Sequence, residues 1–585
     1  MAKIGDYKIS DIYQGGYSSL KPNYGTLFTN YRDDVSNIGL GTDARTANVL
    51  QEVSSKMSTG AKTIELNQVF PEVFNSIPNE QLEEVRRVSK LTGTDITFHA
   101  PIVGLDPSGM DKQGNFSESQ REAVEREMIN TIERAQVIKP KGGLPIVFHA
   151  AEGVPETYPG KTPEEDRAVF VVNTENNSLA KLPLKRREFT GGKEPNVNEE
   201  LSKINKDSWT QNLQNLAYYA DFGEQLIKNS ELMKKYTEAE QKLGKPIADV
   251  QKESLRSYDR GVAHLQDSYR RLGDFYETAY KHASLEDKKK LIEFRDANKD
   301  KIEQIGKDGN VNALKNVVDE GFNLLSNIKH PPEIFKTANQ FVEEKATKTF
   351  GNVAFEAYKK FGDKAPIIAI ENSYAGGAFS TGEGLKKVIE GSRKEFIKNA
   401  IEEGLSKSEA KDQAEKIIGA TWDTGRINTL RKHGFEEEDI IKETEKIAPF
   451  VKHVHLSDNF GMEATEIPMG MGNVPVKEIM EKLGKEGYEG KKVIEAMHWW
   501  QHFKTPPLQQ TFEAFGSPIY SDGVGPYWNQ TLGFQQGYYG GYGMMLPGGH
   551  YQQFGGGFSM ASLPIELGGQ MPGAQGSRMS GKGME

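Results

Sequence analysis

Six residues that can bind a metal ion stand at or near the ends of short apolar segments of the sequence. They are His99, His149, Glu371, Asp423, His455 and Glu495. Imidazole and carboxylate groups suit Zn²⁺ and Mn²⁺ about equally well. Several carboxylates buried together need compensating positive charge. The pattern therefore predicts a site for a divalent metal, Zn²⁺ or Mn²⁺, that holds one ion or two.

The apolar segments themselves alternate with helical patterns, which is typical of βα units. Eight segments have the length and composition of buried strands: 37–41, 63–66, 96–100, 145–150, 366–372, 418–423, 453–458 and 492–496. Amphipathic stretches such as 44–60, 79–93, 118–137, 382–404 and 475–488 follow them. Eight such units predict an α/β fold, a (β/α)8 TIM barrel whose functional groups stand at the carboxyl ends of the strands. The alternative is an open doubly wound sheet, but no Gly-rich phosphate-binding turn follows the first strand.

One connection is far longer than the others and predicts a large insertion after the fourth strand. It opens with a predicted hairpin at 168–189, with Asn176 and Asn177 at the turn, and continues as charged amphipathic helices over 209–236 and 254–283. We expect these helices to lie over the carboxyl-terminal rim of the barrel. The predicted domains are an N-terminal extension (1–35), the two barrel halves (36–158 and 346–515), the mostly helical insertion (159–345) and a C-terminal tail (516–585).

Composition excludes several classes of function. The 585-residue chain has no cysteine, so disulfide scaffolds, zinc fingers, iron–sulfur sites and thiol nucleophiles are ruled out. A net charge of −10 argues against a broad nucleic-acid-binding surface but allows a local basic groove. The absence of an 18-residue apolar run predicts a cytoplasmic protein without membrane spans. The Gly/Tyr/Gln-rich tail predicts a disordered segment, or one that binds a partner or another copy.

The strand-end motifs together resemble a known superfamily. The sequences ITFHAPI, PIVFHAAEG, IIAIENSY, ATWDTGR, VHLSDN and VIEA occur in this order. Their order and placement resemble the xylose isomerase-like TIM barrels, which include AP endonuclease family 2 (endonuclease IV-like) enzymes. The resemblance covers roughly 37–160 and 345–515 and leaves the insertion and the tail unmatched.

Two branches of that superfamily imply different chemistry. Sugar isomerases and epimerases hold one divalent ion through a Glu, Asp, His and Glu set, which corresponds here to Glu371, Asp423, His455 and Glu495. In that branch the two glutamates also carry the proton. The endonuclease IV branch adds the two histidines that correspond to His99 and His149, and Glu371 would then bridge two zinc ions.

The endonuclease branch also uses a third zinc, and this sequence departs from it there. Arg426 stands where that branch has a histidine three residues after the aspartate, and Ala464 and Glu466 stand where it has an Asp-x-His pair. Arg426 could hold a phosphate or carboxylate with its guanidinium fork and so replace the zinc electrostatically. The alternative is that Arg426 pairs with Glu466 or Glu463 and closes a vacated site.

Three smaller signals carry alternatives of their own. His498 and His502 have i,i+4 spacing, but they follow a strand end, where Trp499 and Trp500 are expected to form a pocket wall. His453 should share the inward face of His455 one layer deeper, in the core. The segment 373–384 leads into a helix and could offer backbone amides to an anion, or form a flexible loop.

Three functional hypotheses follow. The first is a divalent-metal enzyme resembling endonuclease IV that hydrolyses a phosphoester, including damaged DNA, with Glu371, Glu495 and Arg426 in the catalytic site. The second is a sugar or hydroxy-carbonyl isomerase or epimerase with one metal. The third is a degenerate barrel that serves as a scaffold and binds a protein partner through the insertion or the tail.

Overall fold

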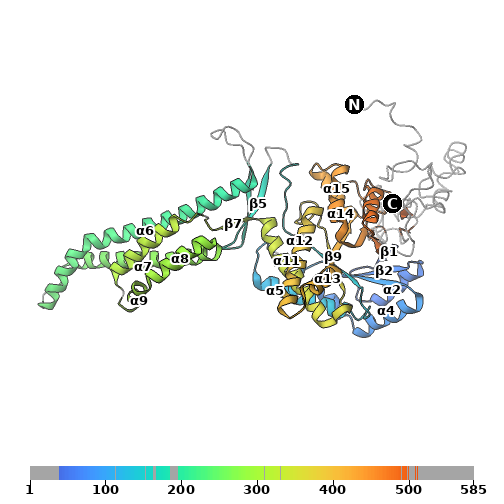
Figure 1. Cartoon of the computed structure of the whole chain (residues 1–585), viewed down its shortest axis with the longest axis horizontal. Helices are drawn as coiled ribbons and strands as arrows, with labels where there is room; N and C mark the ends of the chain where they lie inside the picture. The colour runs from blue at the N-terminus through green and yellow to red at the C-terminus, as the bar shows by residue number, and fades with distance from the viewer. Residues whose placement is uncertain are drawn as a thin grey trace, which may run out of the picture. The chain divides into compact units, whose positions relative to one another are not determined.

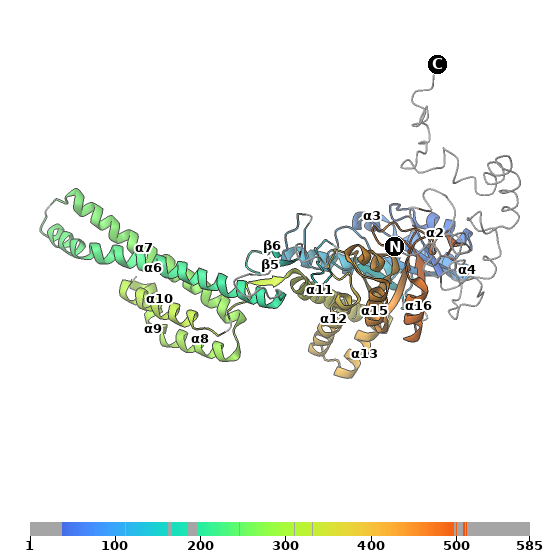
Figure 2. The same ribbon diagram turned by 90° about the horizontal axis from the view of Figure 1, so that it is seen from above.

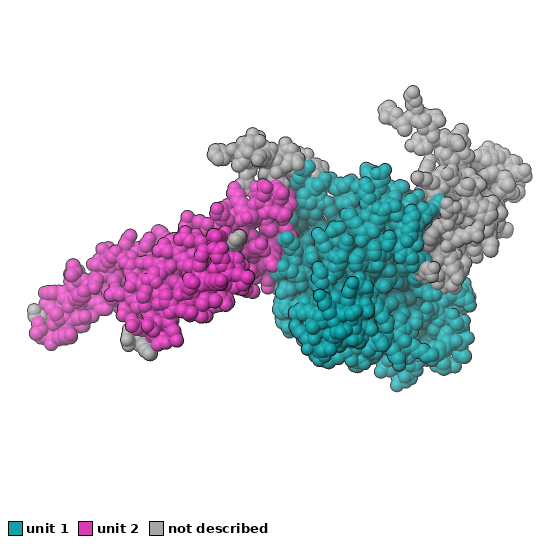
Figure 3. Space-filling view, in the orientation of Figure 1, with its two compact units in different colours: residues 1–170, 338–585 teal, residues 171–337 magenta. Residues whose placement is uncertain are grey.

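A computed structural model describes residues 38–511, except 112, 152, 162–166, 185–195, 245, 309, 330, 489, 497–498, 500–506 and 509. The expected N-terminal extension and tail, and the spaced pair His498 and His502, lie outside the described residues. Two compact units make up the chain, one formed by 1–170 with 338–585 and the other by 171–337 (Figure 3). None of the helices in the described part combines the length and apolar character needed to cross a membrane.

The first unit contains a closed barrel of eight parallel strands, so the predicted TIM-barrel fold is confirmed (Figure 1). The strands follow one another around the barrel in the order β1 (Ile38–Gly41), β2 (Thr63–Asn67), β3 (Asp95–His99), β4 (Pro145–His149), β8 (Ile367–Glu371), β9 (Ile418–Asp423), β10 (Val451–Leu456) and β11 (Lys492–Ile494). All eight coincide with the predicted segments, because each is an apolar run that is covered on both faces. The register pairs His99 of β3 with Asn67 of β2, and His149 of β4 with Glu371 of β8.

Helices cover the outside of the barrel (Figure 1). They are α2 (Val49–Ser58), α3 (Pro71–Ser76), α4 (Asn79–Thr92), α5 (Glu118–Ala135), α11 (Ala338–Phe361), α12 (Gly382–Glu402), α13 (Lys407–Ile417), α15 (Glu437–Ile447) and α16 (Val476–Lys485). The short helix α14 (Thr424–Asn428) instead follows β9 directly and is buried at the carboxyl end of that strand. Local signals set their ends: Ser117 accepts a hydrogen bond from the amide of Gln120 at the start of α5. Gly93 adopts a left-handed conformation (φ 67°) and ends α4.

The second unit is the predicted helical insertion after the fourth strand. It contains α6 (Val197–Lys242), α7 (Asp249–His282), α8 (Leu285–Ala297), α9 (Lys299–Asp308) and α10 (Val311–Ser326), with α6 and α7 side by side (Figure 2). The predicted hairpin is confirmed as β5 (Ala168–Asn173) and β6 (Ser178–Pro183), with Asn177 at positive φ in the turn. A strand that the sequence did not predict, β7 (Phe335–Thr337), pairs with β5 on its other edge.

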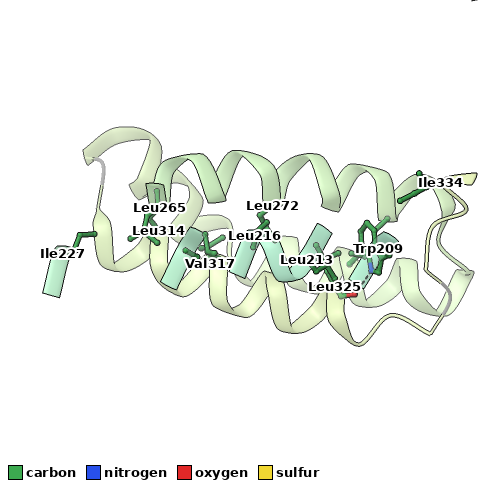
Figure 4. Close-up of a cluster of buried hydrophobic side chains, with 14 residues drawn as sticks. Trp209, Leu213, Leu216, Ile227, Leu265, Leu272, Leu314, Val317, Leu325 and Ile334 are labelled. Carbon is green, nitrogen blue, oxygen red and sulfur yellow. Dashed lines mark hydrogen bonds between the residues drawn. The ribbon is translucent and has the colours of Figure 1, made fainter. Parts of the chain in front are cut away.

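This unit has a hydrophobic core of its own (Figure 4). Trp209, Leu213 and Leu216 of α6 pack with Leu265 and Leu272 of α7 and with the buried face of α10. The indole nitrogen of Trp209 donates a hydrogen bond to the carbonyl of Leu325 (3.3 Å), which satisfies its polar group inside the core. The expectation that the insertion covers the barrel rim stays a prediction.

Candidate metal centre at the carboxyl end of the barrel

Four of the six predicted ligands come together in one cluster. His99, Glu371, His455 and Glu495 each offer one ligand atom, and these atoms lie within 4.8 Å of one another. Nδ1 of His455 is 2.6 Å from Oε1 of Glu371 and 3.2 Å from Oε1 of Glu495. Ligand atoms about 2.0–2.2 Å from a common ion lie roughly 3.0–3.5 Å apart, which the 3.2 Å contact matches, whereas His455 and Glu371 would have to move slightly apart. The four side chains therefore fit a single divalent cation.

Hydrogen bonding prepares His99 for this role. Its Nδ1 lies 2.8 Å from the carbonyl oxygen of Ala100, so the proton belongs on Nδ1 and the lone pair on Nε2. Nε2 points toward Glu371, 3.5 Å from Oε2. Fixing the tautomer through the second ring nitrogen is what metal-binding histidines usually require.

His149 lies beside this cluster. Its Nε2 is 3.1 Å from Oε2 of Glu371 and 3.2 Å from Nε2 of His99. Oε2 of Glu371 is completely buried and accepts no hydrogen bond of good geometry from the described residues, although these nitrogens surround it. An oxygen in that situation is well suited to a cation.

Asp423, by contrast, is turned to other partners. Its Oδ1 accepts hydrogen bonds from the amides of Gly425 (2.7 Å) and Arg426 (3.0 Å), which makes it the N-cap of α14. Ser457 adds a hydroxyl donor at 3.2 Å, and Oδ2 accepts from Nε of Arg426 at 3.1 Å. Asp423 thus lies beside the cluster, but its Oδ1 caps α14 and its Oδ2 accepts a hydrogen bond from the guanidinium of Arg426.

Arg426 is buried in the middle of the site, with its side chain 4% exposed. Besides Asp423, its guanidinium contacts Oε2 of Glu371 (3.3 Å) and Nε2 of His149 (3.1 Å). The guanidinium carbon lies 4.4 Å from the ring centre of Tyr374, which itself donates a hydrogen bond to Glu466 (3.3 Å). Arg426 therefore belongs to the centre of the cluster, and Glu466 to the same pocket.

Sequence reasoning missed Glu65 of β2, which is completely buried beneath the cluster. Its Oε2 accepts hydrogen bonds from Thr97 and from Nε2 of His453, both at 2.9 Å. Its Oε1 is 3.0 Å from Nε2 of His455, although that contact is poorly aligned for a hydrogen bond. His453 is buried one layer below His455, as expected. The signal for Glu65 was a charged residue within the buried run TIEL.

The charges of the site act strongly on one another. Burial favours the neutral form of Glu371, but Arg426 and His455 outweigh it and hold the pKa of Glu371 well below its ordinary value. In the same way His455 and His453 overcome burial and keep the pKa of Glu65 low. Burial also opposes the charged form of His455, yet Glu495, Glu65 and Glu371 raise its pKa well above the ordinary value.

Glu495 differs from the other two carboxyl groups in the direction of its pKa shift. Burial raises the pKa of Glu495 well above its ordinary value; His455 opposes the shift, while Glu371, Asp423 and Glu466 add to it. Burial, and after it the neighbouring carboxylates, thus favour the neutral form of this carboxyl group. A divalent cation among these groups would reverse that preference.

A pocket of about 180 Å³ opens onto the cluster. Its walls combine apolar and charged groups: Leu40, Gly41, Thr42, Asp43, Lys56, Asn67, His99, Ile102, His149, Tyr374, Arg426, Glu466, Ile494, Glu495, Ala496 and Pro507. Lys56, Asn67 and Tyr374 were not singled out in the sequence. Glu495 reaches the pocket with 13% of its side chain exposed, whereas Glu371 is sealed beneath it.

Two amides at the start of α12, at the end of the segment 373–384, already have hydrogen-bond partners. The amide of Gly384 donates to Oγ1 of Thr381 (3.1 Å), and the amide of Glu383 donates to Oε2 of Glu443 (3.0 Å). These two amides are therefore not available to an anion, and the anion-binding interpretation of the segment stays a prediction for its remaining amides.

No family model matches the chain. It is 25% identical over 191 residues to the uncharacterized protein MJ1311 of Methanocaldococcus jannaschii, covering 32% of this chain and 56% of that protein. The chain thus spans about half the length of this relative. A crystal structure of a D-tagatose 3-epimerase-like protein is 12% identical, with a TM-score of 0.35, over 82% of this chain and 99% of that one.

Proposed function

We propose that the barrel rim is the active site of an enzyme that binds one divalent ion, Mn²⁺ or Zn²⁺, and isomerises or epimerises a small hydroxy-carbonyl compound such as a sugar. The ion would be held by His99, Glu371, His455 and Glu495. The observation that carries the proposal is the meeting of these four side chains, two of which, His99 and Glu495, line a small pocket with apolar and charged walls. Its volume of about 180 Å³ suits a small metabolite better than a polymer.

Each residue has a distinct role in this proposal. The ion would supply polarisation of the substrate carbonyl. Glu495, which reaches the pocket, would accept the proton from the carbon that bears the hydroxyl group. For isomerisation it would return that proton to the former carbonyl carbon while the hydroxyl proton passes to the carbonyl oxygen, and for epimerisation a proton would return to the same carbon on its opposite face. Glu371 is sealed below and serves the ion and Arg426. Tyr374 and Glu466 line the pocket and are placed to bind substrate hydroxyl groups.

The test is proton exchange at carbon. The Mn²⁺-loaded protein is incubated in D₂O with a panel of aldoses, ketoses and their phosphates, and deuterium incorporation is followed by NMR. We expect exchange with at least one compound, reduced about 10²–10⁴-fold in Glu495→Gln. Glu463→Gln, an exposed carboxylate on the loop that also carries Glu466, is the matched control and should keep full activity. No exchange with any compound, or equal exchange in Glu495→Gln, contradicts the proposal.

Phosphoester hydrolysis is the second candidate, because His149 supplies an imidazole beyond the four ligands that we assign to one ion. The Nε2 atoms of His99 and His149 face each other at 3.2 Å beside Glu371, as a pair serving a second ion would. The test is incision of a duplex that contains an abasic site, with Zn²⁺ or Mn²⁺ present. Incision that is lost in His149→Ala would favour this candidate. If no metal binds under any loading condition, the scaffold hypothesis remains.

A further inference from the structure

The guanidinium of Arg426 occupies a particular position among the ligands. Its Nη2 lies 3.3 Å from Oε2 of Glu371 and 3.1 Å from Nε2 of His149. Its Nε lies 3.1 Å from Oδ2 of Asp423. These three atoms come from three different strand ends, and each is a donor that a metal ion could use. The positive charge of Arg426 is thus held where three ligand atoms converge.

That charge is permanent and its position is fixed. A guanidinium does not lose its proton in proteins, so the site cannot become neutral to admit a cation. Nη1 lies 3.4 Å from the carbonyl oxygen of Asn372, and the ring of Tyr374 packs against the guanidinium carbon. A divalent cation bound to Glu371 Oε2 and His149 would lie next to this charge in a buried region, where repulsion is screened weakly.

We propose that Arg426 takes the place of a second divalent cation and thereby limits the centre to one ion. The corollary is that an uncharged side chain at position 426 opens a second metal site formed by His149, Asp423 and Glu371. Asp423 would remain in place, because Oδ1 is held by the amides of residues 425 and 426 and by Ser457 rather than by the arginine side chain. The inference rests on the metal centre proposed above but not on the reaction assigned to it.

The experiment measures how many Mn²⁺ ions bind to each chain, by equilibrium dialysis with elemental analysis, and whether they interact, by electron paramagnetic resonance. We expect one isolated ion in the wild type and in Arg426→Lys, which keeps the charge. Arg426→Met should bind two ions with the spectrum of a coupled pair, because ions that share Glu371 would be about 3.5–4 Å apart. The double variant Arg426→Met/His149→Ala should return to one ion.

Two ions in the wild type, no ion in the wild type, or a folded Arg426→Met protein with one ion would each overturn the inference. If Arg426→Met does not fold, His149→Ala in the wild-type background decides. Because we expect the wild type to bind one ion without the help of His149, His149→Ala should change neither the number of bound Mn²⁺ ions nor the affinity for Mn²⁺. A loss of the ion or of affinity overturns the inference. None of these measurements uses a substrate, so a failure of the proposed reaction would be seen separately in the exchange assay.

Discussion

The carboxyl groups of Glu371, Asp423 and Glu495 meet at the carboxyl end of the barrel, and that of Glu65 lies beneath them, all with little contact with water. Arg426 and His455 face them, and burial together with the neighbouring carboxylates raises the pKa of Glu495 above its ordinary value. Buried carboxylates are stabilised only by charges and hydrogen bonds close to them. Charge balance at the level of single residues is therefore what favours a bound cation here.

Glu65 should control the affinity for this ion without touching it. In Glu65→Gln, the negative charge beside His455 and His453 is lost, and the ligand nitrogen of His455 becomes less basic. We expect the Kd for Mn²⁺ to rise about 10–100-fold, as measured by isothermal titration calorimetry. Thr97→Val, which removes only the hydroxyl that donates to Glu65, is the control and should have a smaller effect. An unchanged Kd in Glu65→Gln would show that the buried carboxylate only fills the core.

At the scale of elements, close packing between helices fixes the loops that carry the site. Helix α12 follows β8, the strand of Glu371, and begins at Gly382 directly against the backbone of α15. A Cβ atom on Gly382 would lie 1.9 Å from the carbonyl oxygen of Glu443. No real contact is that short, so the two helices can approach each other only because this residue is glycine.

Gly382→Ala should therefore lower the free energy of unfolding by about 1–3 kcal/mol, because α12 must move away from α15. Urea denaturation followed by circular dichroism measures this. Gly484→Ala in α16 is the matched control: its Cβ would meet nothing within 4 Å, so alanine should be neutral or stabilise by about 0.5–1 kcal/mol. Equal stability of Gly382→Ala and the wild type would mean that α15 can move away from α12 without a loss of free energy of unfolding.

Helices α5 and α11 are linked by a charge cluster that should make stability depend on pH. Burial alone would raise the pKa of Glu118, but Lys345, Lys348 and Arg121 lower it to about 2. A depressed carboxyl pKa contributes stability that is fully present above the unfolded value near 4.5 and is lost as pH falls toward about 2.

Glu118→Gln should accordingly be less stable than the wild type at pH 7, by no more than about 1 kcal/mol because the carboxylate is partly exposed and screened. The difference in urea midpoint should shrink as the pH is lowered below 4.5. Glu122→Gln, on the same helix, is the control. A difference that stays constant between pH 7 and pH 3 would assign the effect to packing rather than to charge.

At the scale of the whole molecule, the chain is a barrel interrupted by an independent helical unit. The insertion has its own hydrophobic core, and Val171 pairs with Thr337 where the chain enters and leaves it. Paired strand residues are only about 5 Å apart, so a short linker can join the flanking residues. This arrangement is typical of inserted domains.

Joining residue 170 to residue 338 through a short Gly/Ser linker should give a barrel that still binds Mn²⁺ with the affinity of the full chain, because all four proposed ligands lie in the first unit. Dialysis and thermal unfolding measure this. The isolated segment 171–337 should unfold cooperatively by itself. If the shortened barrel folds but no longer binds the ion, the insertion contributes to the centre. A change in substrate preference with the metal retained would support the proposed cover over the rim.

The sequence by itself determined the eight strands, the place of the insertion and the strand ends that meet at the site, because each depends on local apolar patterns and on the single arrangement that eight βα units favour. Only the tertiary structure decided that Asp423 is taken up by Arg426 and the cap of α14, and that Glu65 supports His455 and His453. Glu65 and His453 are 388 positions apart and become neighbours only when the barrel closes. The pairing between carboxylates and cations depends on distances of a few ångströms across the barrel. The spacing of these residues along the chain does not determine those distances.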